Sequence, residues 1–538
     1  MVRKGRLRAA FLLQETTDAM SFERRWARAL AHFQDGNHAA ARVACEALTR
    51  ERPRDAGVHW MLSTIAQAGG GFRSSVRHAR LAVADWDRLP AMQRLALVRR
   101  LISVGDYQAA VGYLESIPVV DPGPPCIGEI IEQAAMLDAH VLAGRWLDAA
   151  AAWGHRSAQL AFLRGNHRKF TGDIEGAATA YEEAIALSPV DGHALHALAE
   201  LQLKDGAGRR VDRLRRVIEA GAAAPDSLVA ANYGLFRELD RLGDTAGAWE
   251  ALARGMRLKR SAARHDPDAE RAMFAALSDA LQAMPRAAAA DGGPVPVFIL
   301  GLPRTGTTLV ERMLGNHPDV AACGELSELR MRCKFASDHY CAGVMDAEGA
   351  RRLVGIDPAA VGSEYLAHVA WRIGDRGWFT DKHPGNALLA GVILRALPQA
   401  RVVYVRRNAM DACFSNLKAL FAPGYYEYSY DITDVAVHYR RHARWMRQVV
   451  EASGDRVLEV DYEALVEDPE RQVARIVAHC GLPRAEGLTD LARNASAVST
   501  ASSVQVRDAI YRTGVDAWQR YRSWLAPLEA LLADAGQA

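Results

Sequence analysis

The stretch Val297-Phe-Ile-Leu-Gly-Leu-Pro-Arg-Thr-Gly-Thr-Thr308 decides the fold of the second half of this 538-residue chain. It begins as an apolar run of strand length, passes through a loop with the phosphate-loop spacing Gly-x4-Gly-x-Thr, and leads into an apolar-periodic helix. Backbone N–H groups of such a loop and the N-terminus of the helix bind anions. Thr307 stands where nucleotide-hydrolysing loops carry lysine, and Arg304 supplies a cation from inside the loop. The stretch therefore predicts an anion site that lacks the usual γ-phosphate contact of an ATPase or GTPase.

Further apolar runs of strand length follow this stretch, with helical segments between them. Short apolar strands that alternate with helices are typical of a parallel sheet covered on both faces. Ligands of such sheets bind beyond the carboxyl ends of the strands, so the residues that follow each run are candidates for a site. The further runs are Trp378–Thr380, Val402–Val405 and Val457–Val460. We therefore predict an α/β domain of P-loop-like parallel-sheet type over residues 296–538.

In the first half of the chain, helix follows helix. The segment Gly172–Pro189 resembles the second helix of a tetratricopeptide (TPR) repeat, with Tyr181 and Ala184 facing the neighbouring helix. Turn glycines recur at intervals close to the TPR period of about 34 residues. These glycines are Gly36, Gly71, Gly105, Gly144, Gly172, Gly206 and Gly243. We predict an N-terminal extension (1–20), an all-α TPR solenoid (21–285) and a linker (286–295), with a non-repeating helical bundle as the alternative to the solenoid.

Composition narrows the function classes. The net charge is only +2, so bulk attraction to nucleic acid or to a membrane surface is not indicated. The seven cysteines include no CxxC pair, which favours reduced thiols in a cytoplasmic protein over disulfides or a metal site. No apolar stretch approaches the roughly 18 residues of a transmembrane helix. The partners expected are a substrate and a peptide or protein ligand of the repeats.

A second motif follows the run Val402–Val405 and reads Arg406-Arg-Asn-Ala-Met-Asp-Ala-Cys-Phe-Ser415. Arg407 stands at a strand end, where its guanidinium can bind a phosphate through two hydrogen bonds. Ser415 lies on the next predicted helix and can turn its hydroxyl toward the same anion, while Asp411 fits the first turn of that helix. The alternative is an arginine pair and a serine exposed on the surface. Together with the phosphate loop, the motif favours a second phosphate site.

These two motifs resemble those of the sulfotransferases, which use 3′-phosphoadenosine 5′-phosphosulfate (PAPS) and no metal. The loop resembles their 5′-phosphosulfate loop, and the second motif resembles their R-N-P-x-D-x-x-x-S signature for the 3′-phosphate, with Ala409 in place of the proline. The resemblance implies that PAPS is the donor and PAP the product. It assigns the donor contacts to Pro303, Arg304, Thr305, Gly306, Thr307, Thr308, Arg407 and Ser415.

Two later segments resemble the same family. Val460–Leu465 resembles a Y-E-x-L block whose tyrosine lies near the adenine, which implies that role for Tyr462, with a core aromatic as the alternative. Tyr511–Tyr521 resembles a C-terminal element that closes over the nucleotide. The resemblance implies that Arg512 binds a phosphate and that Ser502 lines the same lid.

Sulfuryl transfer to a hydroxyl needs a base for the proton and cations for the leaving phosphate. The block Cys323-Gly-Glu325 resembles the C-G-E of protein-tyrosine sulfotransferases, whose glutamate is the catalytic base, so Glu325 is the predicted base. Lys382 follows a strand end, where the resemblance implies a contact with the bridging oxygen, and Arg304 adds the cation of the loop. The alternatives for the base are Glu328 and His383.

The pairing of repeats with this domain resembles the bacterial TPR-sulfotransferases. The expected acceptor is a hydroxyl of a protein tyrosine, a sugar, a lipid or a small phenol, bound by loops 326–375 and 418–433. The second loop is aromatic, which suits an acceptor wall, a lid or plain packing. Two other functions stay open: a P-loop kinase or NTPase, which needs a lysine at 307 and a Mg²⁺ carboxylate, and a TPR scaffold with an inactive sulfotransferase-like domain.

Overall fold

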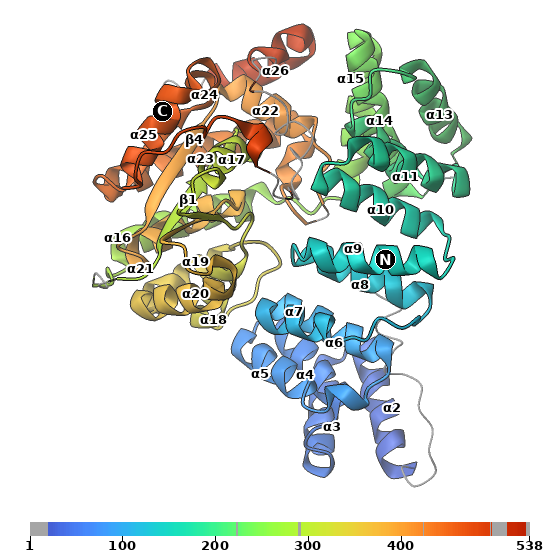
Figure 1. Cartoon of the computed structure of the whole chain (residues 1–538). Helices are drawn as coiled ribbons and strands as arrows, with labels where there is room; N and C mark the ends of the chain where they lie inside the picture. The colour runs from blue at the N-terminus through green and yellow to red at the C-terminus, as the bar shows by residue number, and fades with distance from the viewer. Residues whose placement is uncertain are drawn as a thin grey trace. The chain divides into compact units, whose positions relative to one another are not determined.

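The structure is a computed structural model that describes residues 20–221, 224–288, 292–422, 424–494, 497, 510 and 514–533. The chain divides into two compact units. Unit 1 comprises the residues up to His155 together with Met331–Cys341, and unit 2 comprises Arg156–Arg330 and Ala342–Ala538. Figure 1 traces both units along the chain. No helix in the described ranges combines the length and the apolar character needed to cross a bilayer. The domain boundaries proposed from the sequence stay predictions.

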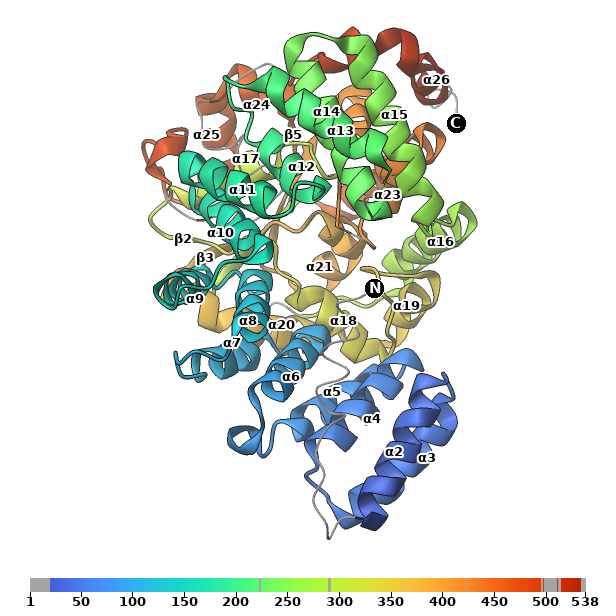
Figure 2. The same ribbon diagram turned by 90° about the vertical axis from the view of Figure 1, so that its right-hand side faces the viewer.

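Unit 1 is helical throughout its described part, and its helices pair in sequence as hairpins (Figures 1 and 2). Gly36 lies in the turn between α2 and α3, and Gly71 in the turn between α4 and α5. Gly105 follows the last residue of α6 and has φ 80°. The helices are α2 (Met20–Gln34), α3 (His38–Glu51), α4 (Ala56–Ala68), α5 (Phe72–Ala82), α6 (Ala91–Val104), α7 (Tyr107–Glu115), α8 (Pro124–Met136) and α9 (His140–Ala152). The predicted all-helical first half is thus confirmed.

The prediction that Gly144 occupies a turn is wrong. Gly144 lies inside α9, and the turn before that helix is made at Asp138, which has φ 55°. Aspartate is one of the few residues besides glycine that adopt the left-handed conformation, because its short polar side chain bonds locally. Spacing alone therefore picked the wrong residue for this turn.

The segment Met331–Cys341 belongs to unit 1 because Arg73 binds it at three places. The Arg73 side chain donates from Nε to the Phe335 carbonyl (2.9 Å) and from Nη2 to the Ala336 carbonyl (2.6 Å). Its backbone N–H donates to Asp338 Oδ1 (2.8 Å). The Tyr340 ring stacks on Phe72 of α5, with 5.9 Å between the ring centroids. These contacts bind a segment more than 250 residues further along the chain to α5.

The helices of unit 2 begin with those of the repeat region. Tyr181 is fully buried, and a Cβ on Gly165 would lie 2.4 Å from its ring, so the glycine lets these two helices approach closely. Tyr181 and Ala184 are buried between helices, as predicted. The helices are α10 (Ala158–Thr171), α11 (Ile174–Leu187), α12 (Gly192–Glu200), α13 (Ala207–Ala220), α14 (Pro225–Leu242), α15 (Thr245–Ala262) and α16 (Pro267–Ala283).

The strands of unit 2 form one five-stranded parallel sheet in the order β2-β3-β1-β4-β5. Each apolar run identified in the sequence falls within one strand, and the predicted parallel sheet is confirmed. The strands are β1 (Val295–Leu300), β2 (Val320–Ala322), β3 (Trp378–Asp381), β4 (Arg401–Arg406) and β5 (Val457–Asp461). The strand that carries the phosphate loop, β1, therefore lies at the centre, between β3 and β4.

Helices cover both faces of the sheet because residues of a strand alternate between faces. Val297 and Ile299 pack into the core shared with α17, α24 and α25, whereas Phe298 stacks on Tyr365 of α20 with 5.8 Å between ring centroids. The helices after β1 in unit 2 are α17 (Thr307–Gly315), α19 (Ala347–Arg352), α20 (Pro358–Ile373), α21 (Ala390–Ala396), α22 (Ala409–Leu417), α23 (Ile432–Ser453), α24 (Tyr462–Glu467), α25 (Pro469–His479) and α26 (Arg522–Ala533). Helix α18 (Glu328–Ser337) begins in unit 2, and its residues from Met331 onward belong to unit 1.

Within unit 2, repeat helices and site helices share one apolar core. The Tyr521 ring lies 6.2 Å from the ring of Phe236 on α14 and 5.0 Å from that of Phe414 on α22. The Tyr233 hydroxyl donates to the Leu417 carbonyl at the end of α22 (3.3 Å). Helix α22, which carries one of the predicted donor contacts, is therefore linked to repeat helix α14 through the Tyr521 ring and the Tyr233–Leu417 hydrogen bond.

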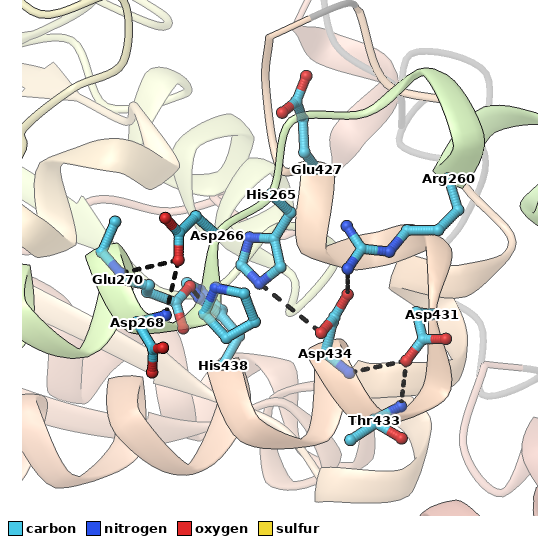
Figure 3. Close-up of polar contacts among 12 residues, drawn as sticks. Arg260, His265, Asp266, Asp268, Glu270, Glu427, Asp431, Thr433, Asp434 and His438 are labelled. Carbon is cyan, nitrogen blue, oxygen red and sulfur yellow. Dashed lines mark hydrogen bonds and ion pairs between the residues drawn. The ribbon is translucent and has the colours of Figure 1, made fainter.

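A polar joint links the end of the repeat region to α23 (Figure 3). Arg260 of α15 and His265 both point at Asp434, at 2.7 and 3.9 Å respectively. Glu270 of α16 accepts from His438 Nδ1 (2.6 Å) and from Arg441 Nη1 (2.7 Å). Burial favours the neutral form of Glu270, but its interactions with neighbouring groups, among them the hydrogen bonds from His438 and Arg441, outweigh this and lower its pKa to about 2.

Replacing Gly105 by alanine is expected to destabilise unit 1 more than replacing Gly36. Each substitution forces an L-residue into the left-handed region, at a cost of about 1–2 kcal/mol. A Cβ on Gly105 would also lie 2.6 Å from Met331 Cβ, whereas a Cβ on Gly36 meets nothing within 4 Å. Calorimetric unfolding of both variants tests this, and equal losses in the two midpoints would contradict the packing described.

The Glu270→Gln variant is expected to unfold at a lower temperature than the wild type at neutral pH. Because the folded-state pKa of Glu270 lies below its ordinary value of 4.5, the carboxylate contributes its full stability above that pH. The contribution is lost as pH falls toward 2, so wild type and variant should converge in thermal scans over that window. Asp268→Asn, which alters an exposed carboxylate of the same helix, is the control and should differ little from wild type at any pH.

Candidate active site

The site is built by connections that leave one edge of the sheet. In a parallel sheet the carboxyl ends of all strands lie at the same edge, so the residues that follow β1 to β5 meet there. The phosphate loop follows β1, Glu325 follows β2, and Lys382 follows β3. Arg407 follows β4 and Tyr462 follows β5. Sequence segments more than 150 residues apart are thereby brought together at this edge.

The phosphate loop is a tight cradle between β1 and α17. A Cβ on Gly301 would lie 2.7 Å from both the Val405 carbonyl oxygen and Thr305 Oγ1. Arg304 has φ 69° and Gly306, the N-cap of α17, has φ 102°, so the chain turns sharply at both residues. The backbone N–H groups of Thr307 and Thr308 have no hydrogen-bond acceptor among the described residues. A helix N-terminus with such donors favours an anion.

Tyr462 lies directly against this loop. A Cβ on Gly306 would lie 2.5 Å from Tyr462 Cδ2, so only glycine fits beneath the ring. The guanidinium carbon of Arg407 lies 4.6 Å from the centroid of the same ring, in a cation–π contact. The structure therefore places Tyr462 beside both predicted phosphate sites rather than in the centre of the core.

Arg407 and Ser415 are brought together, as the second motif predicts. Arg407 Nη1 donates to the Arg304 carbonyl (2.8 Å) and lies 3.4 Å from Ser415 Oγ, and Nη2 donates to the Gly514 carbonyl. Its Nε is buried without a hydrogen-bond acceptor among the described residues. A buried donor of a charged group without an acceptor costs free energy, which an anionic ligand at this point would recover. Arg407 thus ties the loop to α22 and keeps one donor for a ligand.

The neighbouring arginine does not face this site. Arg406 pairs with Glu459 (3.0 Å) and with Asp461 (2.9 Å) along the exposed end of β5. Asp411, predicted in the first turn of α22, is there, and its Oδ2 accepts from the Asp516 backbone (2.8 Å). The first turn itself is capped by the Asn408 side chain. The predicted contacts Ser502 and Arg512 lie outside the described residues.

Lys382 and Glu325 form an ion pair at the ends of β3 and β2. Lys382 Nζ donates to Glu325 Oε1 at 2.7 Å and lies 3.8 Å from Glu311 Oε2. The lysine side chain is fully buried, whereas 37% of the Glu325 side chain is exposed. Glu325 Oε2 has no partner among the described residues. One oxygen of Glu325 is therefore committed to the ammonium and the other is open to a ligand.

The surrounding charges set the protonation of this cluster. Burial opposes ionisation of Glu325, but the charge of Lys382 and the hydrogen bond from its ammonium contribute to outweighing it and lowering the pKa of that carboxyl. Burial lowers the pKa of His383 to about 4, so its imidazole is neutral near pH 7. His383 Nδ1 accepts from the Gly385 backbone (3.0 Å), which puts the ring proton on Nε2. Of the two, Glu325 is the group with an open acceptor atom.

Three polar residues at this edge were not identified from the sequence. Asn416 donates to the Pro303 carbonyl (2.9 Å) and so fixes the loop to α22. Lys418, one turn beyond Ser415, lies 4.6 Å from the Phe414 ring, and burial lowers its pKa to about 8 against the opposing charge of Asp240. Glu311 is the third. The charged pair Glu311-Arg312 between apolar residues of the segment 309–314 was the available signal for Glu311, but the sequence does not say which way either side chain points.

An aromatic segment follows α22. Tyr426 has φ 51°, which is uncommon for a non-glycine residue and strained for a bulky one. Its ring packs edge-on against Phe421 (4.9 Å) and lies 6.3 Å from Tyr428, which stacks on His438 at 3.5 Å. The predicted aromatic loop is thus a packed cluster anchored on α23. Glu328, the competing base, pairs with Arg372 instead (3.2 Å).

Comparisons with known proteins agree with this geometry. Residues 296–486 match the family model described as "Sulfotransferase family". A protein of Aquifex aeolicus (strain VF5) is 26% identical over 372 residues, covering 68% of this chain and 48% of that protein. Protein-tyrosine sulfotransferase 1 of Danio rerio is 24% identical over 196 residues, covering 35% of this chain and 53% of that protein. The chain thus spans about half the length of these relatives.

Solved structures with similarity to the chain include two kinds of protein. The sulfotransferase domain from the Synechococcus PCC 7002 olefin synthase matches with 21% identity and a TM-score of 0.31, covering 43% of this chain and 90% of that one. A tetratricopeptide repeat protein from Parabacteroides merdae matches with 12% identity and a TM-score of 0.35, covering 44% of this chain and 93% of that one. The region that carries the five-stranded parallel sheet is therefore the region that matches the sulfotransferase family model.

Proposed function

We propose that this protein transfers the sulfuryl group of PAPS to a hydroxyl of its acceptor. The observation that carries the proposal is that three features follow strands at one edge of the sheet: the open N–H groups at the start of α17, the Arg407 Nε without an acceptor among the described residues, and the Lys382–Glu325 ion pair. PAPS carries a phosphosulfate and a separate 3′-phosphate, which match a site with two anion-binding ends. Bound there, it would supply a sulfuryl group on a phosphate leaving group.

The donor contacts follow from this arrangement. The loop residues Pro303–Thr308 would bind the phosphosulfate through backbone N–H groups, with Arg304 as the cation. Arg407 and Ser415, which already lie 3.4 Å apart, would bind the 3′-phosphate. Tyr462, beside both sites, offers its ring to the adenine. Ser502 and Arg512 remain proposed contacts of the same nucleotide.

Glu325 and Lys382 divide the chemistry between them. When the acceptor oxygen forms its bond to sulfur, the bond from sulfur to the bridging phosphate oxygen breaks and the hydroxyl proton leaves. Glu325 Oε2 takes that proton, since Oε1 is occupied by the lysine. The Lys382 ammonium stabilises the negative charge on the leaving phosphate. His383 suits the base role less well, because its Nδ1 already accepts a hydrogen bond from the Gly385 backbone N–H.

The acceptor that fits best is a tyrosyl or other phenolic hydroxyl. Two observations support it: the aromatic cluster of Phe421, Tyr426 and Tyr428 beyond α22, and the similarity to protein-tyrosine sulfotransferases of Danio rerio and Caenorhabditis briggsae. An aromatic wall favours a planar acceptor by offset or edge-on packing. The helical repeats would then bind the peptide or protein that carries the acceptor.

Calorimetric titration with PAP, beside ATP–Mg²⁺, tests the donor. Wild type should bind PAP and prefer it to ATP–Mg²⁺, because Thr307 replaces the lysine of nucleotide-hydrolysing loops. Arg407→Ala should weaken PAP binding by about ten- to a hundredfold, as expected for the loss of charge-assisted hydrogen bonds worth roughly 1.5–3 kcal/mol.

Arg406→Ala is the matched control for this titration, because the neighbouring arginine pairs with Glu459 and Asp461 on the surface. It should bind PAP as the wild type does. A preference of the wild type for ATP–Mg²⁺ would favour a kinase or NTPase. Absence of binding to both nucleotides would favour a scaffold with an inactive domain.

The base is tested by Glu325→Gln against His383→Asn. Glu325→Gln should lower kcat by about 10²–10⁴-fold, the usual effect of losing a general base, while PAP binding is retained. His383→Asn keeps a side chain able to cap the turn at Pro384 and should retain most of the activity. Labelled-sulfate transfer to a tyrosyl peptide, p-nitrophenol and a simple sugar measures both, and a larger loss in the histidine variant would reverse the assignment.

A further inference from the structure

A third carboxylate, Glu311, lies beside the Lys382–Glu325 pair. It projects from α17, and only 10% of its side chain is exposed. A buried carboxylate is unfavourable unless it is paired and hydrogen-bonded, so its partners indicate what it does. Glu311 Oε1 accepts from the Gly324 backbone N–H (2.9 Å) and from Thr380 Oγ1 (3.2 Å). Its Oε2 lies 3.8 Å from Lys382 Nζ.

These partners are neighbours of the two predicted catalytic side chains. Gly324 immediately precedes Glu325, and Thr380 precedes Lys382 by two residues. The same two segments also bind each other, since Lys382 N donates to the Gly324 carbonyl (2.9 Å) and Cys323 N donates to Thr380 Oγ1 (3.3 Å). Glu311 therefore joins the end of β2 to the end of β3 from the helix that follows the phosphate loop.

We propose that Glu311 is a positioning residue for the transfer reaction, which fixes Glu325 and Lys382 relative to the phosphate loop. The inference rests on the proposed function. Glu311 acts through its hydrogen bonds to the Gly324 backbone and the Thr380 hydroxyl. Helix α17 begins at Thr307 in the anion-binding loop and carries Glu311. The same helix is therefore continuous with the loop and hydrogen-bonded to the residue that precedes Glu325.

The hydrogen-bond acceptor, rather than the charge, carries this role. Burial raises the pKa of Glu311. The positive charge of Lys382 opposes this rise, and the negative charge of Glu325 adds to it. A protonated Glu311 would still accept both hydrogen bonds through its carbonyl oxygen. Glutamine offers the same acceptor in the same place, whereas leucine has the size but no acceptor.

The experiment compares Glu311→Leu and Glu311→Gln in the full-length chain, with Glu328→Gln as the matched control. Glu328 is another buried glutamate close in sequence to Glu325, but it pairs with Arg372. Four quantities are measured: the hydrogen–deuterium exchange rate of the Gly324 amide, the affinity for PAP, kcat, and KM for PAPS. Turnover is followed with whichever tested hydroxyl accepts sulfate, or with water as acceptor if none does.

Glu311→Leu should speed exchange of the Gly324 amide at least about tenfold, because a hydrogen bond of ordinary net strength is lost. It should lower kcat by about 10–100-fold, the usual cost of losing a residue that orients a reacting group. PAP affinity and KM for PAPS should change by less than about threefold, since substrate binding is not the step affected. Glu311→Gln should restore both the slow exchange and most of kcat, and Glu328→Gln should leave the Gly324 amide protected.

The inference is overturned if Glu311→Leu keeps wild-type kcat, or if its loss appears in PAP affinity instead. It is also overturned if Glu311→Gln loses as much kcat as Glu311→Leu. If Glu311→Leu does not fold, Glu311→Asp takes its place with the same expectations, because its carboxylate is one methylene too short for Gly324. A wild type that binds no PAP would remove the proposed function, whereas the exchange measurement would still decide whether Glu311 secures Gly324.

Discussion

The parallel direction of the five strands is the constraint on which the rest of this structure depends. Parallel strands deliver every following connection to one edge, and the order β2-β3-β1-β4-β5 puts the phosphate loop at the middle of that edge. The residues that follow β3 and β4 then flank the loop, with Lys382 on one side and Arg407 on the other. A strand reversed in this sheet would send its connection to the opposite edge, and the corresponding side chain would leave the site.

Hydrogen bonds and ion pairs with neighbouring groups explain how these ionic side chains remain at this edge. Arg407 binds backbone carbonyls from the loop and from Gly514, and Lys382 is shared by two carboxylates. A buried ion pair adds little net stability to a fold, since desolvation offsets most of the attraction. Breaking one partner is costly all the same, because the other charge is left unpaired. The network therefore rigidifies the site more than it stabilises the molecule.

The repeat region contributes to the site through packing. Helix α22, which carries Ser415 and the Asn416 bond to the loop, lies on an aromatic core formed with Tyr233 and Phe236 of α14. The joint of Glu270, His438 and Arg441 fastens the next helix, α16, to α23. In unit 2 the last repeat helices are thus structural neighbours of the region that matches the sulfotransferase family model, and the position of Ser415 depends on them.

The sequence by itself determined the features that depend on residues close together along the chain. Apolar runs, the glycine loop and the spacing of Arg407 and Ser415 are local features, so β1, β3, β4, β5 and the parallel sheet type were predicted. The short strand β2 (Val320–Ala322) was not among the predicted runs. The turn near Gly144 was missed because Asp138 adopts the same backbone conformation without being glycine. Only the tertiary structure decided that Glu311 meets Gly324 and Thr380, that Asn416 binds Pro303, and that Arg406 turns away while Arg407 turns in. Those contacts join residues far apart in the chain, and their geometry exists only once the strands have aligned in one sheet.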